Sequence, residues 1–203
     1  MPDPTVQSDK RTDAELVRAY QDGDEQAFIA LIERYKLELF HFLARFLNNR
    51  TAAEDIFQET FLQIHISVDS FDQTRSFKPW LFTIAANKAR DYLRKVNRGG
   101  NHVTSLPDAD GDGERAVVEL VDAELPQPLE LAANQETRRI VQEVVGSLPE
   151  HLREILLLAY FHQVPYKEIA QSLKIPLGTV KSRLHAAVGT FAQAWRERMK
   201  KNG

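Results

Sequence analysis

The sequence predicts an all-α protein built from two small helical domains joined by a flexible acidic linker. Apolar residues recur every three or four positions on both sides of the middle of the chain, which is the spacing of amphipathic helices. No stretch of any length alternates as a strand does, and no internal repeat is visible. The middle is rich in Gly, Pro and Asp and lacks sustained periodicity, apart from a short helical patch at 115–122. We therefore expect a tail at 1–12, a first domain at 13–98, the linker at 99–136 and a second domain at 137–203.

The charge of the chain is distributed unevenly along its length. The formal net charge is −3, which by itself argues against a nucleic-acid partner. Residues 1–100 carry 14 Lys and Arg against 15 Asp and Glu, residues 101–136 carry 1 against 9, and residues 137–203 carry 11 against 5. Residues 75–98 alone hold 7 basic side chains against the single acidic Asp91. Two basic regions suited to phosphates therefore flank an acidic middle.

Several classes of function are disfavoured by what the sequence lacks. The chain has no cysteine, which excludes disulfides, thiolate zinc sites and thiol catalysis. Its 6 histidines show no ligand-like spacing, and neither a phosphate-binding glycine loop nor a catalytic triad is visible. No apolar run approaches the roughly 18 residues of a membrane span, and the first residues are polar. We expect no catalytic activity, no cofactor, no metal ion, no membrane insertion and a cytoplasmic location.

The first domain is expected to begin with three helices. Asp13 precedes the first, and a long second helix over 25–47 ends at Asn48 and Asn49. Thr51 followed by Glu54 has the pattern of a capping box, which predicts the start of the third helix. The expected core positions are Phe28, Leu31, Ile32, Tyr35, Leu39, Phe40, Leu43 and Phe46 in the second helix, and Phe57, Phe61 and Ile64 in the third.

One side of the third helix carries a polar patch that contains a leucine. Asp55, Gln58, Glu59 and Leu62 are spaced i, i+3, i+4 and i+7, so they form one contiguous surface of a helix. The spacing is compatible with a solvated charged face and with a binding surface, and a solvated face is the commoner case.

The stretch RSFKPWLFTIAANKARDYLRK mixes aromatic and basic residues. Residues 72–79 are expected to form a loop, with Pro79 in the first turn of a helix over 80–95. Projection on that helix assigns one side to the core, with Leu81, Phe82, Ala85, Ala89, Tyr92 and Leu93. The other side carries Thr83, Asn87, Arg90 and Arg94, with Trp80 at its edge. These residues alone are equally compatible with a solvated helix and with a surface that holds an unstacked base.

The second domain has the hydrophobic spacing of a helix-turn-helix. Two short helices are expected before it, separated at 147–149. A tight connection then separates a short helix over 166–173 from a helix that begins at Leu177. Lys174 occupies the usual Gly position of this connection, so either a left-handed backbone there costs about 1 kcal/mol or the turn differs slightly. Val180, Leu184, Val188, Phe191 and Trp195 form the expected buried seam. The outward face has Lys181, Ser182, His185 and Ala186, while Thr179 suits a phosphate contact and Arg183 a phosphate clamp. A helical bundle that binds no DNA is the alternative.

The order of these motifs resembles the sigma-70 family, in its two-domain extracytoplasmic-function (ECF, group IV) form. The resemblance rests on DIFQETFLQI, SFDQTRSFKPWLFTIAANKARDYLRK and SLPEHLREILLLAYFHQVPYKEIAQSLKIPLGTVKSRLHAA, in that order along the chain. It implies a sigma region 2-like helical bundle and a region 4-like helix-turn-helix domain. It also implies three partners, namely core RNA polymerase through its β′ clamp helices and β flap, promoter DNA, and an anti-sigma factor.

The resemblance also assigns roles to residues. Asp55, Gln58, Glu59 and Leu62 match the helix that binds the β′ clamp helices. The residues matched to opening of the minus-10 element and capture of a flipped base are Arg75, Ser76, Phe77, Lys78, Trp80, Asn87, Arg90 and Arg94. Those matched to the minus-35 element in the major groove are Thr179, Lys181, Ser182, Arg183 and His185.

The chain departs from the family pattern in three places. Ala186 stands where the family often has Arg, Lys174 stands in the turn, and the linker is long and acidic. The acidic linker could mimic RNA in the polymerase exit channel. Two other functions are compatible with the motifs, a stand-alone helix-turn-helix regulator and a polymerase adaptor that does not bind DNA.

Overall fold

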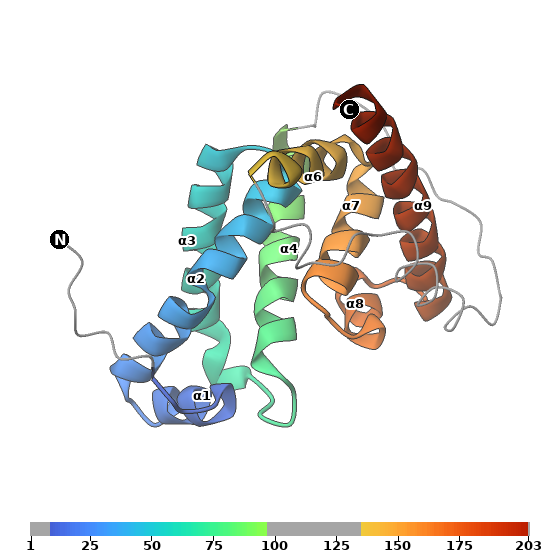
Figure 1. Cartoon of the computed structure of the whole chain (residues 1–203). Coiled ribbons are helices and arrows are strands. Elements are labelled where there is room, and N and C mark those ends of the chain that lie inside the picture. The colour runs from blue at the N-terminus through green and yellow to red at the C-terminus, as the bar shows by residue number, and fades with distance from the viewer. Residues whose placement is uncertain (1–8, 97–134, 203) are drawn as a thin grey trace.

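The computed structural model describes residues 9–96 and 135–202, and all regular structure in these two ranges is helical. The first range folds into a bundle, and the second folds into a smaller helical domain beside it (Figure 1). The predicted all-α class is therefore confirmed. Residues 99–134 of the predicted linker, with its helical patch, lie outside the described residues, and α6 begins at Gln135, two residues before the predicted start of the second domain. The first bundle comprises α1 (Asp13–Gln21), α2 (Glu25–Leu47), α3 (Arg50–Ser67), the short 3₁₀ turn η1 (Val68–Ser70) and α4 (Phe77–Val96).

The long helix α2 is the centre of the first domain. It packs against α1, α3 and α4, and its Phe42 and Phe46 are fully buried together with Phe82 of α4. Asp24 caps its start by accepting a hydrogen bond from the Gln26 amide. At the other end Asn48 adopts a left-handed backbone, φ 50°, a conformation that Asn tolerates better than most residues. The predicted bounds of this helix are therefore confirmed.

The third helix begins earlier than the capping-box pattern predicted. Asn49, not Thr51, is its N-cap, and the Asn49 side chain accepts a hydrogen bond from the Ala52 amide at 3.1 Å. Glu54 instead forms an ion pair with Arg50. The buried side of α3 also differs, because Ile56 and Thr60 are buried with Phe61 and Ile64, whereas the predicted Phe57 is only partly buried.

The cap of α3 gives a direct test of this difference. We expect Asn49→Ala to lower the free energy of unfolding by about 1 kcal/mol, because an amide of the first turn loses its acceptor. Thr51→Ala is the matched control and should change it by less than about 0.5 kcal/mol, because Thr51 is exposed inside the helix. Urea unfolding of both variants measures the two values, and a larger loss for Thr51→Ala would contradict the assignment of the cap.

The fourth helix also starts before its predicted position. α4 begins at Phe77, so Phe77 and Lys78 belong to the helix and the preceding loop shortens to residues 72–76. Pro79 lies in the first turn, as predicted. Phe77 is 3% exposed and packs against Tyr35, Phe71 and Trp80, so it is a core residue and not an exposed base-stacking side chain.

The second domain has the helices that the sequence predicted. α6 (Gln135–Ser147) and α7 (Glu150–Leu156) lead into a π-helical turn, η3 (Leu157–Phe161). The helix-turn-helix consists of α8 (Tyr166–Leu173) and the first half of α9 (Leu177–Asn202). Lys174 between them is left-handed, φ 54°, so the turn has the expected geometry despite the lack of Gly. The seam of α9 is buried at Val180, Leu184, Val188 and Phe191, and partly buried at Trp195.

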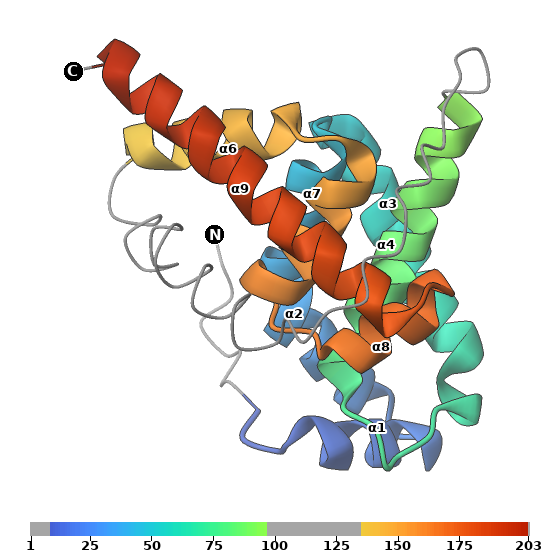
Figure 2. The ribbon, with the colours of Figure 1, turned by 90° about the vertical axis from the view of Figure 1, so that its right-hand side faces the viewer.

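The two domains pack directly against each other. α6 and α7 contact α2, and α8 contacts α4 (Figures 1 and 2). We call this relation of the domains the docked arrangement. It brings residues of the second domain onto the basic side of α4, where the sequence places the nucleic-acid surface.

Candidate functional surfaces

The polar patch on α3 is exposed in the docked arrangement. Asp55, Gln58 and Glu59 all face solvent, and Leu62 is 59% exposed. One turn further along, Ile66 is 66% exposed and lies on the same side of the helix. Ile66 was not among the predicted residues, although its i+4 spacing from Leu62 indicates the same side of the helix. We define the α3 surface as Asp55, Gln58, Glu59, Leu62 and Ile66. Two exposed apolar side chains among acidic and amide groups are typical of an interface.

The basic side of α4 is occupied by neighbouring carboxylates. Arg94 is 66% exposed and forms an ion pair with Asp91 on its own helix. Arg90 is only 18% exposed, donates to the Asn87 side chain, and forms an ion pair with Glu154 of α7 at 3.1 Å. We define the α4 ridge as Asn87, Arg90 and Arg94. Its central arginine is therefore covered by the second domain.

Two basic residues before the ridge are also paired. Arg75 in the loop lies 3.6 Å from Glu168 of α8, and Lys78 lies 2.7 Å from Glu38 of α2. Trp80 is half-buried and packs against Phe71, with ring centroids 4.6 Å apart. Of the predicted minus-10 residues, Ser76 and Arg94 are exposed without a contact to the second domain in any described interaction. The structure thus pairs the predicted cations Arg75, Lys78, Arg90 and Arg94 with carboxylates of the same chain.

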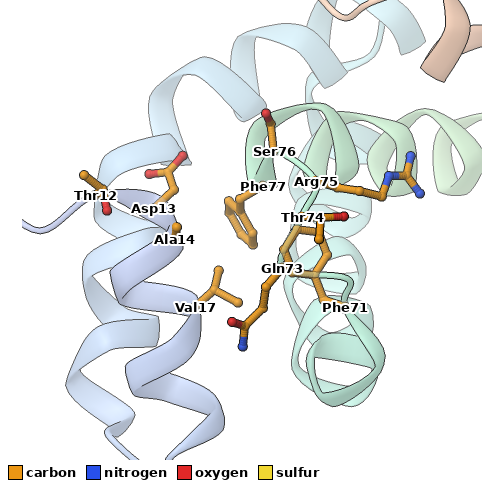
Figure 3. A pocket seen from close by; sticks show the side chains of 10 residues that line it. All are labelled: Thr12, Asp13, Ala14, Val17, Phe71, Gln73, Thr74, Arg75, Ser76 and Phe77. Atoms are coloured by element: carbon orange, nitrogen blue, oxygen red, sulfur yellow. The ribbon is translucent and has the colours of Figure 1, made fainter.

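The loop before α4 borders a cavity of about 320 Å³ (Figure 3). Asp72 shapes the loop by accepting hydrogen bonds from both the amide and the hydroxyl of Thr74. Ser76 and Arg75 both line the cavity, and the Arg75 side chain extends away from the α1 residues (Figure 3). The opposite wall is the start of α1, including Thr12 and Asp13. This wall was not predicted, because no local feature of the sequence links α1 to the loop.

Glu154 lies at the centre of a charged cluster between the domains. It is 4% exposed, and burial raises its pKa to about 7, although the nearby charge of Arg90 opposes this shift. The positive charge of Arg183 in α9 also acts on this carboxyl group. A predicted minus-10 arginine and a predicted minus-35 arginine therefore act on the same carboxylate.

His162 of the second domain is inserted into the first domain. The π-helical turn places it, since the His162 amide donates to the Leu157 carbonyl, and Gln163 then reverses the chain with φ 52°. The imidazole stacks on Phe82, centroids 4.2 Å apart, and meets Phe42 edge to face at 5.1 Å. Its Nδ1 is 3.1 Å from Glu38. The ring is 5% exposed, so it fills a site formed by α2 and α4.

The environment of His162 favours the neutral imidazole. Burial lowers its pKa, with smaller opposing effects from Glu38 and further lowering from the charges of Lys78 and Arg45. Burial alone would raise the pKa of Glu38, but hydrogen bonds from His162 and Lys78 outweigh burial and hold this pKa below its usual value. Glu38 is therefore a carboxylate, and it accepts a hydrogen bond from Nδ1 of His162. Nε2 is buried with no hydrogen-bond partner among the described residues, and a proton there would have no acceptor.

This environment predicts the titration of His162. In the folded chain we expect the imidazole to titrate at a lower pH than in the urea-unfolded chain, where it should titrate near 6.5. Because its pKa is lowered in the docked arrangement, its contribution to stability is complete above about pH 6.5 and is lost as the pH falls towards the lowered pKa. Long-range ¹H–¹⁵N correlation spectra measure both titrations, and equal pKa values in the two states would contradict the burial of this ring.

The outward side of α9 is only partly open. His185 is exposed, whereas Thr179, Lys181 and Ser182 are half-buried. Arg183 is also half-buried, and its Nε is buried with no hydrogen-bond partner among the described residues. Its charge affects His151 as well as Glu154, so it faces α7. The helix therefore presents Lys181, Ser182 and His185 as one face, and Arg183 lies beside it.

Neither metal binding nor a membrane span is indicated in the described part of the chain. In residues 9–96 and 135–202 no group of three or more His, Asp or Glu side chains is arranged to hold a metal ion. The helices in these ranges are too short or too polar to cross a membrane.

The chain is similar to proteins of known class over both domains. The family model Sigma-70 region 2 matches residues 31–99, and the model Sigma-70, region 4 matches residues 138–190. The ECF RNA polymerase sigma factor SigW of Bacillus subtilis is 32% identical over 170 residues, which cover 83% of this chain and 89% of that protein. The ECF RNA polymerase sigma-E factor of Escherichia coli K12 is 34% identical over 180 residues, which cover 89% of this chain and 92% of that protein.

Two solved structures have a similar fold. CnrH, solved in complex with the cytosolic domain of CnrY, has a TM-score of 0.61 at 24% identity and covers 89% of this chain and 95% of its own. The sigma factor RpoE of Bartonella quintana, solved with the anti-sigma factor NepR, has a TM-score of 0.59 at 21% identity. The similarity covers 83% of this chain and 96% of RpoE. These similarities support the two-domain fold.

Proposed function

Because the chain belongs to the ECF sigma factors of the sigma-70 family, which direct core RNA polymerase to promoters, we propose that its two domains divide this work between separate surfaces. The observation that carries the proposal is that the α3 surface and the α4 ridge lie on different helices of one bundle, while the helix-turn-helix forms a second domain. One domain can then bind polymerase and the minus-10 element together, and the other can bind the minus-35 element.

The α3 surface is the proposed contact with core polymerase. Its acidic and amide groups surround Leu62 and Ile66, which gives an apolar centre with a polar rim. By the family resemblance the partner is the coiled coil of the β′ clamp helices. The β flap is the corresponding proposed partner of the second domain.

The α4 ridge and the neighbouring cavity are the proposed site for melted minus-10 DNA. Arg90 and Arg94 supply positive charge for phosphates, and Trp80 is the aromatic side chain at the edge of the ridge. The cavity between the loop and α1 is the proposed site of the flipped base, with Ser76 on one wall and Thr12 and Asp13 on the other. Phe77 is excluded from direct stacking by its burial.

The first half of α9 is the proposed reader of the minus-35 element. Lys181, Ser182 and His185 face outward and can donate to base edges or phosphates in a major groove. Thr179 lies in the first turn, where helix amides favour a phosphate. Ala186 cannot make the contact of the Arg that the family often has there, so the upstream sequence preference should differ from that of relatives with Arg.

The mechanism requires no chemical step by this chain. Binding energy gained by trapping unpaired minus-10 DNA offsets the cost of opening the duplex, so no nucleotide hydrolysis is needed. An anti-sigma factor is a further proposed partner, as is found with the RpoE protein of similar fold. Because a sigma factor acts where the polymerase is, a cytoplasmic location is part of the proposal.

Transcription in vitro with core polymerase on a library of random promoters tests the proposed function. We expect transcripts only when the chain is added, and sequencing of the active templates should yield two conserved elements at one separation. A chain that footprints duplex DNA without polymerase would instead be a stand-alone regulator. A chain that binds polymerase but selects no template would be an adaptor.

A further inference from the structure

We propose that Asp13 selects the base held in the cavity between α1 and the loop, by accepting a hydrogen bond from an exocyclic amino group. Adenine, cytosine and guanine carry such a group and are accepted, whereas thymine lacks it and is rejected. The inference rests on the proposed function, because it takes the cavity as the site of the flipped base from there. It goes further in assigning the choice of base to α1, which lies outside residues 31–99 that match the Sigma-70 region 2 model.

The cavity places Asp13 opposite the loop that precedes α4. Asp13 is the first residue of α1, and its side chain is 26% exposed on the wall across from Ser76 (Figure 3). Val17, Phe71 and Phe77 also line the cavity, and each of them is at most 8% exposed. A base in the cavity would therefore lie against apolar side chains and meet polar groups along its edge.

Most hydroxyl and amide donors around the cavity are already engaged. The Thr12 hydroxyl donates at 2.8 Å to a glutamate of α1, and the Thr74 hydroxyl donates at 2.7 Å to an aspartate of the loop. The Gln73 amide nitrogen donates to a glutamine of α1. The Ser76 hydroxyl has no hydrogen bond to the described residues, so it is the lining hydroxyl that remains available to a ligand. The cavity therefore offers few donors to the carbonyl groups of a base.

Asp13, in contrast, retains the capacity to accept hydrogen bonds. Its Oδ1 accepts from Nη1 of Arg34, and its Oδ2 accepts from the hydroxyl of Tyr35. Each carboxylate oxygen has two lone pairs, so each can accept one further hydrogen bond. Tyr35 is 8% exposed, which fixes the orientation of the carboxylate from the core side. The start of α1 thus presents an oriented anionic acceptor to the cavity.

The four bases differ in what they offer to a carboxylate. An amino group of adenine, cytosine or guanine can donate a charge-assisted hydrogen bond to it. The single ring N–H of thymine lies between two carbonyl oxygens, which the carboxylate repels. A site built to accept from a donor rejects a base that lacks one, because the polar group of the site is then left unpaired. We therefore expect Asp13 to discriminate against thymine.

Removal of a single amino group from the DNA tests this contact. In the minus-10 element of a promoter selected from the random library, each base of the non-template strand is replaced in turn by its analogue without the amino group. Purine replaces adenine, pyrimidin-2-one replaces cytosine, and hypoxanthine replaces guanine. With core polymerase and the unmodified chain, we expect one position at which the replacement slows open-complex formation by about tenfold or more. With Asp13→Ala, the same replacement should slow it by less than about twofold.

Asp13→Asn tests the contact with a side chain of equal size. Its carbonyl oxygen can still accept from Arg34, and its N–H groups can donate to a carbonyl of a base. The measured quantity is the rate of opening with thymine at the sensitive position, divided by the rate with the amino-bearing base. We expect this ratio to be at least about threefold higher for Asp13→Asn than for the unmodified chain. Damage to folding would slow both templates and leave the ratio unchanged.

Two control variants separate the base contact from the stability of α1. Tyr35→Phe removes one hydrogen bond from Asp13 but leaves the carboxylate in place, so loss of the amino group should still slow opening by more than about fivefold. Asp22→Ala removes an exposed acidic side chain that follows α1 and does not line the cavity. It should leave the response to the amino group unchanged.

The outcomes separate this inference from the proposed function. If Asp13→Ala and the unmodified chain respond alike to loss of the amino group at every position, Asp13 does not select the base. Thymine as the preferred base at the position that responds to Asp13→Asn would also overturn the inference. In both cases the chain still opens promoters, so the proposed function stands. If no template of the library is transcribed, the proposed function fails and the inference falls with it.

Discussion

Replacing Asp55 and Gln58 together by alanine should weaken binding to core RNA polymerase by about tenfold or more. Both side chains are exposed on the α3 surface beside Leu62, and their polar groups have no other role in the described structure. Loss of two polar contacts that border the apolar centre of an interface is expected together to cost about 1.4 kcal/mol, which corresponds to tenfold in affinity. Titration of labelled core polymerase with each protein measures the effect.

The matched control removes one acidic and one amide side chain elsewhere. Gln193 and Glu197 form an exposed hydrogen-bonded pair on α9, and their replacement by alanine should change the affinity by less than about twofold. If the α3 variant also retains its affinity, the α3 surface is not part of the polymerase interface. Circular dichroism of each variant, compared with the unmodified chain, confirms that the helices are retained.

Replacing Arg90 by alanine should reduce open-complex formation by about tenfold or more, while polymerase affinity stays within about twofold. A lost contact to a phosphate or base is expected to cost about 1–3 kcal/mol, and a contact made only with melted DNA affects opening more than polymerase binding. Permanganate reactivity of unpaired thymines measures opening, and the same preparations are used for polymerase titration. Equal losses of opening and of polymerase affinity would contradict the assignment of the α4 ridge to DNA.

Glu154→Gln is the matched control for Arg90→Ala. Both variants remove the same ion pair between the domains, but only the arginine is proposed to contact DNA. If loss of the ion pair alone explained the defect, the two variants would behave alike. We expect Glu154→Gln to open promoters at least as fast as the unmodified chain, because it weakens the docked arrangement and leaves Arg90 in place.

The sequence by itself determined the helices and the order of the domains. Apolar spacing, the breaks at Asp22–Asp24 and Asn48–Asn49, and Pro149 are local features, and the structure has helix ends at or beside each of them. The error at the start of α3 was also local in origin. Asn49 caps α3 because its side chain accepts a hydrogen bond from the Ala52 amide. Thr51 therefore lies inside the helix and does not act as its cap. Four residues of the α3 surface, Asp55, Gln58, Glu59 and Leu62, followed from helical spacing alone.

Only the tertiary structure decided what covers the α4 ridge. Glu154 lies 64 residues from Arg90 in sequence, and His162 lies 124 residues from Glu38. Neither pair can be recognised in the sequence from hydrophobic periodicity or from a capping pattern, because each side chain is compatible with a solvated position in its own helix or turn. Likewise, Phe77 is buried by Tyr35 and Phe71, which come from other elements. The sequence could therefore identify a basic helix suited to nucleic acid. The ion pair between Glu154 and Arg90, which covers the central arginine of that helix, forms only when the two domains pack together.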